Sequence, residues 1–157
     1  MKIKLLCVGK NNRSVWFKSL EDYLIRINRY ASFTIEYVSE VKKGKKNIHY
    51  LIKKEETKKL MLKIKKEDVV ILLDEKGKSL NSTAFARKIE NYQNNSVQSL
   101  VFVIGGAYGF SDEIYSNFTN RICLSEMTFS HQMIRLFFCE QLYRAFTIIN
   151  NHPYHNQ

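Results

Sequence analysis

The chain has 157 residues, of which 45% are hydrophobic, and it carries a formal net charge of +10 at neutral pH. This size and composition predict one globular domain with its own core. No run of about 18 apolar residues is present and the amino terminus lacks a secretory signal, so we exclude a membrane span and expect a cytoplasmic protein. Cys7, Cys123 and Cys139 are far apart, which predicts buried free thiols and neither disulfides nor a metal site.

Short apolar runs alternate with amphipathic stretches along the whole chain. In chain order, the patterns predict a strand at residues 3–8, a helix at 15–30, a strand at 33–38, a lysine-rich helix, a strand at 69–73, a turn at 74–78, a helix around 84–92, strands at 100–104 and 121–124, and a long helix at 131–150. Asn81 or Ser82 can cap the third helix, and Ser111 can cap a short helix before the last strand. This alternation predicts an α/β protein with a mostly parallel sheet and helices on both faces.

Most of the excess positive charge lies in one segment. Residues 42–66 contain eleven lysines and two glutamates, whereas the rest of the chain is nearly neutral. A cationic surface attracts polyanions through counterion release, so RNA or DNA is a candidate partner. Apolar residues at near-helical spacing are equally consistent with a solvated helix that packs on the core; these residues are Ile48, Leu51, Ile52, Leu60 and Ile64. Both interpretations stay open at this point.

A strand followed at once by glycines indicates a binding site. The run 100–104 has the β-branched content of a central parallel strand, and Gly105 and Gly106 follow it directly. Ligands of open α/β sheets bind at the carboxyl ends of the strands. The segment Gly-Gly-Ala-Tyr-Gly is neither a dinucleotide fingerprint nor a P-loop. The glycines alone suit a tight turn, and the strand ends at Leu73 and Leu124 shift the interpretation toward a site.

Longer stretches of the chain also form a recognisable pattern. They are Met-Lys-Ile-Lys-Leu-Leu-Cys-Val-Gly-Lys at 1–10, Leu-Leu-Asp-Glu-Lys-Gly-Lys at 72–78, Phe-Val-Ile-Gly-Gly at 102–106 with Tyr108 and Gly109, Leu-Ser-Glu-Met-Thr-Phe at 124–129, His-Gln-Met-Ile-Arg at 131–135, Glu-Gln-Leu-Tyr-Arg-Ala at 140–145 and His-Pro-Tyr-His at 152–155. With these stretches the chain resembles the RlmH family, the ribosomal large-subunit methyltransferases of the SPOUT superfamily. The resemblance therefore covers residues 1–157 as a single domain. Ser130 stands where the family pattern has proline, and we expect a looser loop there.

The resemblance implies a fold whose carboxyl-terminal part is tied in a trefoil knot, a rare exception to unknotted chains. It also implies a homodimer that uses S-adenosyl-L-methionine to methylate N3 of pseudouridine 1915 in 23S rRNA, on assembled ribosomes. Four apolar side chains of the implied cofactor pocket would form a slot for the adenine. The implied pocket residues are Leu73, Gly105, Leu124, Ser125, Glu126, Met127, Thr128 and Phe129, of which Leu73, Leu124, Met127 and Phe129 form that slot.

The implied reaction asks for few catalytic side chains. Methyl transfer from a sulfonium is an in-line displacement that depends mainly on holding the acceptor near the methyl group. The acceptor imide must also lose a proton, so a base or a cation beside it would help. With the resemblance, Tyr154, His155 and Arg144 are the catalytic candidates, although a frayed terminus and an Arg144–Glu140 ion pair are the alternatives. His131 is interpreted as a structural, hydrogen-bonding residue near the pocket.

The last predicted helix carries more apolar residues than one core-facing stripe requires, which predicts a two-fold interface. Deep burial within one subunit is the alternative. Two other functions stay open beside the methyltransferase. One is a non-catalytic basic RNA-binding or ribosome-assembly factor with the same fold, and the other is a related knotted methyltransferase of tRNA, whose motifs match less well.

Overall fold

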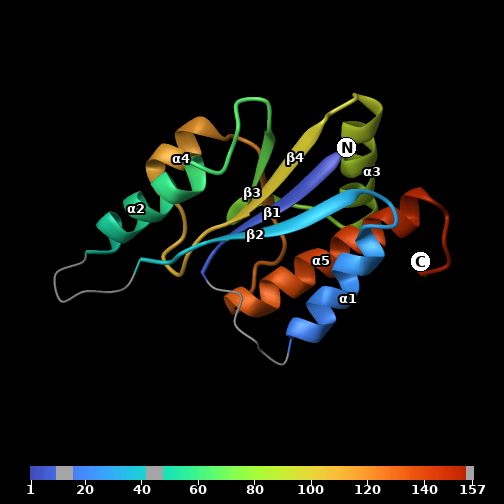
Figure 1. Cartoon of the computed structure of the whole chain (residues 1–157), viewed down its shortest axis with the longest axis horizontal. Helices are drawn as coiled ribbons and strands as arrows, with labels where there is room; N and C mark the ends of the chain where they lie inside the picture. Colours follow the sequence, from blue (N-terminus) through green and yellow to red (C-terminus); the bar gives the residue numbers. More distant parts are fainter. Residues whose placement is uncertain (10–15, 42–47, 155–157) are drawn as a thin grey trace.

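The computed structural model describes residues 1–9, 16–41 and 48–154. Within these residues, one sheet of five strands has the order β2-β1-β4-β3-β5, and every neighbouring pair is parallel (Figure 1). The predicted parallel sheet is therefore confirmed. The strands are β1 (Lys2–Val8), β2 (Ser32–Val38), β3 (Val69–Ser79), β4 (Ser99–Ile104) and β5 (Arg121–Cys123).

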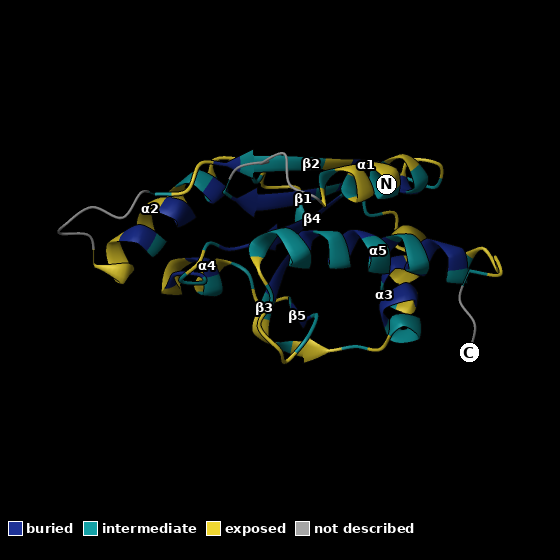
Figure 2. Ribbon diagram, turned by 90° about the horizontal axis from the view of Figure 1, so that it is seen from below, coloured by how far each residue is buried: buried dark blue, intermediate teal, exposed yellow. Residues whose placement is uncertain are grey.

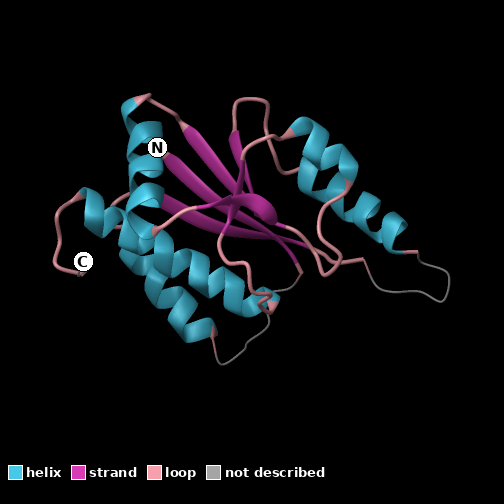
Figure 3. Ribbon diagram, turned by 180° about the vertical axis from the view of Figure 1, so that it is seen from behind, coloured by secondary structure: helices cyan, strands magenta, loops and turns pink. Residues whose placement is uncertain are grey.

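Helices cover both faces of the sheet, as the alternating pattern predicts. Figure 3 shows a group of helices on each side of the strands. The first group is α1 (Phe17–Ile27), α3 (Ser82–Asn94) and α5 (His131–Ile149), and the second is α2 (His49–Met61) and α4 (Asp112–Asn117). No helix in the described part of the chain is long and apolar enough to cross a membrane. The trefoil knot stays a prediction.

The central strands are apolar on both faces because each face packs against helices. In β4, Phe102 and Ile104 belong to the core under α1, α3 and α5, whereas Val101 and Val103 belong to the core under α2 and α4. Each of these four side chains is at most 5% exposed, and such burial stabilises the fold by about 1.5–3 kcal/mol per large side chain. Figure 2 shows this buried layer between the two sets of helices. The three cysteines are buried and unpaired, as predicted.

The prediction of a turn at 74–78 is wrong, because β3 continues through these residues to Ser79. The local turn chemistry is nevertheless present. The Asp74 Oδ1 atom accepts a hydrogen bond of 2.8 Å from the Lys76 amide, and the pairing of β3 with β5 shifts register between Leu73 and Lys78. The irregularity therefore bends an edge of the sheet without ending the strand.

The lysine-rich helix is α2, and it only partly follows its apolar pattern. Ile52 and Leu60 are buried, but Ile48 and Leu51 remain 69% and 46% exposed. Glu56 is buried instead, together with its neighbour Thr57. The core-packing interpretation thus holds for one narrow stripe. Residues 42–47, which carry part of the lysine cluster, lie outside the described residues.

Two predicted helix starts carry side-chain caps, whereas the predicted cap by Ser111 is wrong, because its hydroxyl bonds to that of Thr57 and not to the start of α4. Asn81 Oδ1 accepts a hydrogen bond of 2.8 Å from the Ala84 amide at the start of α3. Ser130 Oγ accepts one of 3.3 Å from the Met133 amide at the start of α5. Such caps are worth about 1 kcal/mol. Ser130 therefore starts α5 with a hydrogen bond that a proline side chain could not accept.

Candidate functional site

Three chain segments, each at or just after the end of a buried strand, meet at the carboxyl edge of the sheet. They are the end of the apolar part of β3, the loop after β4 and the loop after β5. Between them lies a cavity of about 470 Å³, and a hollow of about 140 Å³ continues it toward the loop after β5. We call the two together the carboxyl-edge cavity. Seven residues line both parts, so the two hollows adjoin: Leu73, Asp74, Glu75, Ile104, Thr128, Phe129 and Ile134.

The glycine loop, residues 105–110, forms one wall of this cavity. A Cβ atom on Gly106 would overlap the carboxylate of Glu56, and one on Gly105 would lie 3.2 Å from the Phe110 ring. Gly109 has a φ of +75°, which favours glycine. Its amide donates a hydrogen bond of 2.9 Å to the Gly106 carbonyl. The loop is therefore both the tight turn and the cavity wall that the sequence left as alternatives.

The loop after β5, residues 124–129, forms the opposite wall. Ser125 holds this loop from within, because its Oγ accepts a hydrogen bond of 2.9 Å from the Met127 amide. The Phe129 ring stacks on Phe137 of α5, with 5.8 Å between ring centroids. Met127 is 75% exposed. The structure thus brings together all the residues predicted for the cofactor pocket: Leu73, Gly105, Leu124, Ser125, Glu126, Met127, Thr128 and Phe129.

Beyond the predicted residues, the cavity has acidic side chains to which the sequence assigned no role. Asp74, Glu75 and Asp112 line it. The Tyr115 hydroxyl donates a hydrogen bond of 2.7 Å to Asp74 Oδ2, and burial together with this bond raises the pKa of Tyr115. Arg121 lies 5.1 Å from the centre of the Tyr115 ring. Asp74 and Glu75 lie on the extension of β3 past Leu73, where a turn was predicted, whereas Asp112 begins α4.

His131, at the start of α5, also lines the carboxyl-edge cavity. Burial, and then the nearby charge of Arg135, lower its pKa below the ordinary value of 6.5. The imidazole is therefore neutral at neutral pH and can accept a proton. The predicted position near the pocket is confirmed, but the ring forms no hydrogen bond within the described part of the chain.

The predicted catalytic residues Tyr154 and Arg144 lie together elsewhere, in what we call the tail cluster: Tyr23, Glu140, Tyr143, Arg144 and Tyr154. Arg144 Nε donates a hydrogen bond of 3.0 Å to Glu140 Oε1, so the alternative ion pair forms. The Tyr154 hydroxyl donates one of 3.2 Å to the same oxygen. Burial, followed by the hydrogen bond with Tyr23, raises the pKa of Tyr154, which keeps its phenol protonated. His155 lies outside the described residues.

The tail cluster and the carboxyl-edge cavity of the same chain lie far apart. Arg144 follows His131 by 13 residues in the same helix, which corresponds to about 20 Å at 1.5 Å per residue. In Figure 1 the carboxyl terminus lies beyond the far end of α5, away from the start of that helix. The residues predicted for the cofactor pocket and the two described catalytic candidates therefore lie in separate places within one chain.

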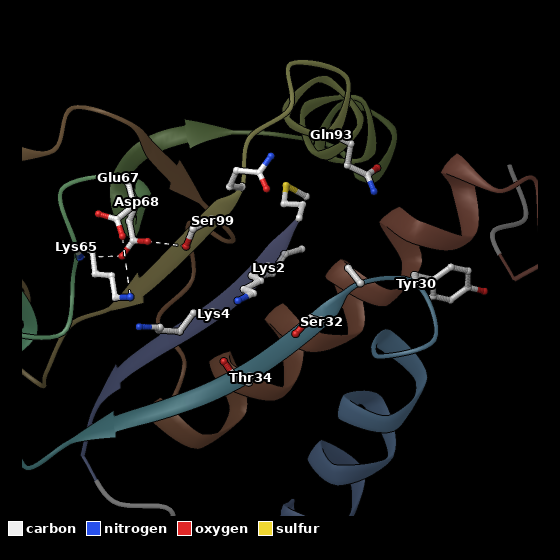
Figure 4. A pocket seen from close by; sticks show the side chains of 14 residues that line it. Lys2, Lys4, Tyr30, Ser32, Thr34, Lys65, Glu67, Asp68, Gln93 and Ser99 are labelled. Atoms are coloured by element: carbon white, nitrogen blue, oxygen red, sulfur yellow. Dashed lines mark hydrogen bonds and ion pairs between the residues drawn. The ribbon is translucent and has the colours of Figure 1, made fainter.

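A larger hollow of about 720 Å³ lies at the opposite, amino-terminal edge of the sheet (Figure 4). Some of its polar groups already bond to one another. Asp68 accepts hydrogen bonds from the Lys65 amide and the Ser99 hydroxyl, at 2.8 and 2.5 Å. None of the predicted site residues lines it. Since ligands of parallel sheets bind at the carboxyl ends of strands, we place the site in the smaller cavity.

A parallel α/β sheet with a glycine loop and a cavity at its carboxyl edge defines a protein that binds a small ligand at its strand ends. Residues 1–155 match the family described as "Predicted SPOUT methyltransferase". The chain belongs to this SPOUT methyltransferase family, as its sequence resemblance predicts.

Relatives are similar over their full length. The chain is 45% identical to a protein of Flavobacterium psychrophilum and 46% identical to one of Phocaeicola vulgatus, with 100% of both chains covered in each comparison. Both proteins are named "Ribosomal RNA large subunit methyltransferase H". Among solved structures, a probable methylase family protein from Haemophilus influenzae Rd KW20 is similar with a TM-score of 0.51 and 12% identity, over 99% of this chain and 70% of that one. This last likeness concerns the fold alone.

Proposed function

We propose that this protein is an S-adenosylmethionine-dependent methyltransferase that modifies large-subunit ribosomal RNA at N3 of a pseudouridine, position 1915 of 23S rRNA. The observation that carries the proposal is the full-length identity of 41–46% to relatives named for large-subunit rRNA methylation. The carboxyl-edge cavity supports it with a site where a methyl donor fits. We further propose that the protein acts in the cytoplasm on assembled ribosomes.

The residues of the cavity fit S-adenosylmethionine. Its larger part, of about 470 Å³, falls in the size range of small-molecule sites, and the hollow of about 140 Å³ adds to it. Leu73, Ile104 and Phe129 offer apolar surface to an adenine, and the glycine loop lets a ligand approach its backbone amides closely. The carboxylates of Asp74 and Glu75 suit a ligand that carries positive charge. When bound, the cofactor supplies a methyl group on a sulfonium, ready for in-line displacement.

The side chains of this chain then have modest tasks. The walls of the cavity hold the acceptor nitrogen in line with the methyl group, and alignment of this kind can supply most of the acceleration. His131 is neutral, and we assign a nitrogen of its ring the role of accepting the imide proton. The raised pKa of Tyr154 argues against a phenolate base in the tail.

We keep the tail as a second part of the site and propose that the partner subunit of a homodimer supplies it. Tyr154 and Arg144 lie far from the cavity of their own chain, so a partner is the route by which they and His155 reach an acceptor. In that position the Arg144 guanidinium would stabilise the anion that forms on the acceptor base. Leu136 and Phe137 on the outer side of α5 are only half-buried and leave apolar surface for such an interface.

Methyl transfer to ribosomes from a strain that lacks the modification tests the proposal. Radiolabelled S-adenosylmethionine and nucleoside analysis should identify N3-methylpseudouridine in 23S rRNA. Ribosome binding without labelled product would instead favour a non-catalytic RNA-binding factor. Labelling of free tRNA would point to a different substrate for the same fold.

A further inference from the structure

One face of α2 lies along the glycine loop. His49 stacks on Tyr108, with ring centroids 4.0 Å apart and an angle of 21° between the ring planes. Two turns later, the Thr57 and Ser111 hydroxyls form a buried hydrogen bond of 2.7 Å just beyond the loop. Between these two contacts, Lys53 lines the carboxyl-edge cavity. The helix is therefore a wall of the site as well as the carrier of lysines.

Tyr108 lies between His49 and the cavity. The tyrosine lines the cavity and is half-buried, whereas His49 is exposed and does not line it. The stacked histidine thus supports the tyrosine ring from the solvent side. Proteins bind unpaired nucleobases by stacking them on aromatic rings of this kind, without regard to base identity.

Lys53 is half-buried beside this ring pair and forms no ion pair or hydrogen bond within the described residues. Other lysines of α2 are engaged by the protein itself. Lys58 pairs with Glu55 at 2.8 Å, and Lys59 donates a hydrogen bond of 2.8 Å to the Ser39 carbonyl. An unpaired ammonium group at an open cavity is suited to a phosphate of a polyanion.

Tyr108 and Lys53 line the larger part of the cavity, to which the loop after β5 contributes only Thr128 and Phe129. Lys53 and Tyr108 line the larger part only, whereas Leu124 and Met127 line the smaller part only. Because the two parts adjoin and share lining residues such as Ile104 and Phe129, a base bound in the larger part can lie next to a methyl donor bound in the smaller part. The two reactants would then meet within one subunit.

We propose that Tyr108, supported by His49, and Lys53 form the acceptor-nucleotide subsite. The Tyr108 ring stacks on a base of the RNA and Lys53 binds a neighbouring phosphate. This inference rests on the proposed methyltransferase function and deepens it, because it states where the RNA strand enters. The two contacts are independent of base identity, so the subsite contributes binding and orientation rather than sequence choice.

The first test replaces the ring. Tyr108→Leu keeps an apolar side chain but removes the stacking face, and Tyr108→Phe keeps the face. With modification-free ribosomes as substrate, the leucine variant should lower kcat/KM by roughly tenfold or more. The phenylalanine variant should match the wild type, and both should keep the affinity for S-adenosylmethionine, measured by calorimetry, within about twofold. A matched control is Tyr92→Leu, because Tyr92 is a half-buried tyrosine beside Lys88 on α3, on the other face of the sheet.

The second test removes the charge. Lys53→Ala should weaken ribosome binding and reduce by about one the slope of log affinity against log salt. Lys58→Ala is the control, since that lysine already pairs with Glu55. An unchanged kcat/KM in Tyr108→Leu would overturn the inference. A parallel loss of cofactor affinity would also overturn it, because the ring would then belong to the cofactor site. If the wild type makes no methylated product, the proposed function fails, whereas ribosome binding by these variants still reports on the subsite.

Discussion

The carboxyl-edge cavity and the tail cluster contain similar side chains but differ in what those side chains do. In the tail cluster, Arg144 and Tyr154 both bond to Glu140, and the Arg144 guanidinium lies 4.8 Å from the centre of the Tyr154 ring. In the cavity, Lys53 and His131 form no such bonds within the described residues. A set of mutually satisfied groups stabilises a chain end, whereas groups without partners around an open space are available to a ligand.

Aromatic and charged residues near a chain end therefore do not by themselves indicate catalysis. Within one chain the tail cluster is a packed structure, and the catalytic role that we propose for it depends on a partner subunit. The cavity, by contrast, has the position, the volume and the available groups for a methyl donor in the same chain. The predictions below separate the two regions.

The largest expected effect follows from Gly106→Val. A side chain here overlaps the Glu56 carboxylate, and the glycine loop must move away from its cofactor-binding shape. Overpacking of this kind costs about 1–3 kcal/mol, so affinity for S-adenosylmethionine should fall by about 10- to 100-fold in calorimetry. Ribosome binding should persist.

A second variant makes this prediction sharper. The smaller change Gly106→Ala should also weaken cofactor binding, and Glu56→Ala should restore part of it in the double variant by making room for the added methyl group. Wild-type affinity in Gly106→Val would remove the glycine loop from the site.

The next effect concerns the tail. Removal of residues 154–157 should lower turnover about tenfold, because the acceptor loses its contacts with the partner's tail. Cofactor affinity should stay within about twofold. Tyr154→Phe keeps the ring packing on Tyr143 and Arg144 and should retain turnover, since the phenol is not ionised. Equal rates for the truncated and full-length chains would make the tail purely structural.

His131→Asn should lower turnover severalfold and change its pH dependence. In the wild type, the pKa of His131 lies below 6.5, so protonation should reduce turnover only as the pH falls below that value. The asparagine variant should lose this acid limb and keep its cofactor affinity. An acid limb that persists in the variant would assign the proton acceptor to another group.

The smallest effect is on stability. Burial raises the pKa of Glu56 above its ordinary value of 4.5, and its Oε2 atom has no hydrogen-bond partner among the described residues. A buried carboxyl is tolerated best in its protonated, neutral form. Its contribution to folding stability is therefore fully present below pH 4.5 and is lost as the pH rises through the raised pKa. Glu56→Gln should therefore be more stable than the wild type at neutral pH in urea unfolding, with the difference shrinking toward pH 4. A difference that does not vary with pH would contradict this cause.

Much of the fold and of the cofactor pocket could be predicted from the sequence, because both depend on local signals. The run 100–104 is apolar on both faces and ends in glycines, which indicates a central strand and a site at its end. The features that could not be predicted from the sequence depend on contacts between distant segments. The segment that contains Asp74 and Glu75 has the composition of a turn, and only the pairing of β5 with β3 makes it part of a strand.

The wall formed by α2 was hidden for the same reason. Lys53 belongs to a run of lysines that looks uniform, and only its place beside Tyr108 distinguishes it from the exposed Lys54. Likewise, the separation of Tyr154 from the cavity follows from the length of α5 and not from any motif. The family resemblance predicted which residues take part, but it gave no distance between them.

An NMR titration of the protein with S-adenosylmethionine, following the backbone amides, tests most directly whether the cofactor binds in the carboxyl-edge cavity. We expect large chemical-shift changes at Gly105, Gly106 and the loop 124–129, with little change at Arg144 and Tyr154. Changes confined to the tail cluster, with the glycine loop unaffected, would contradict this expectation.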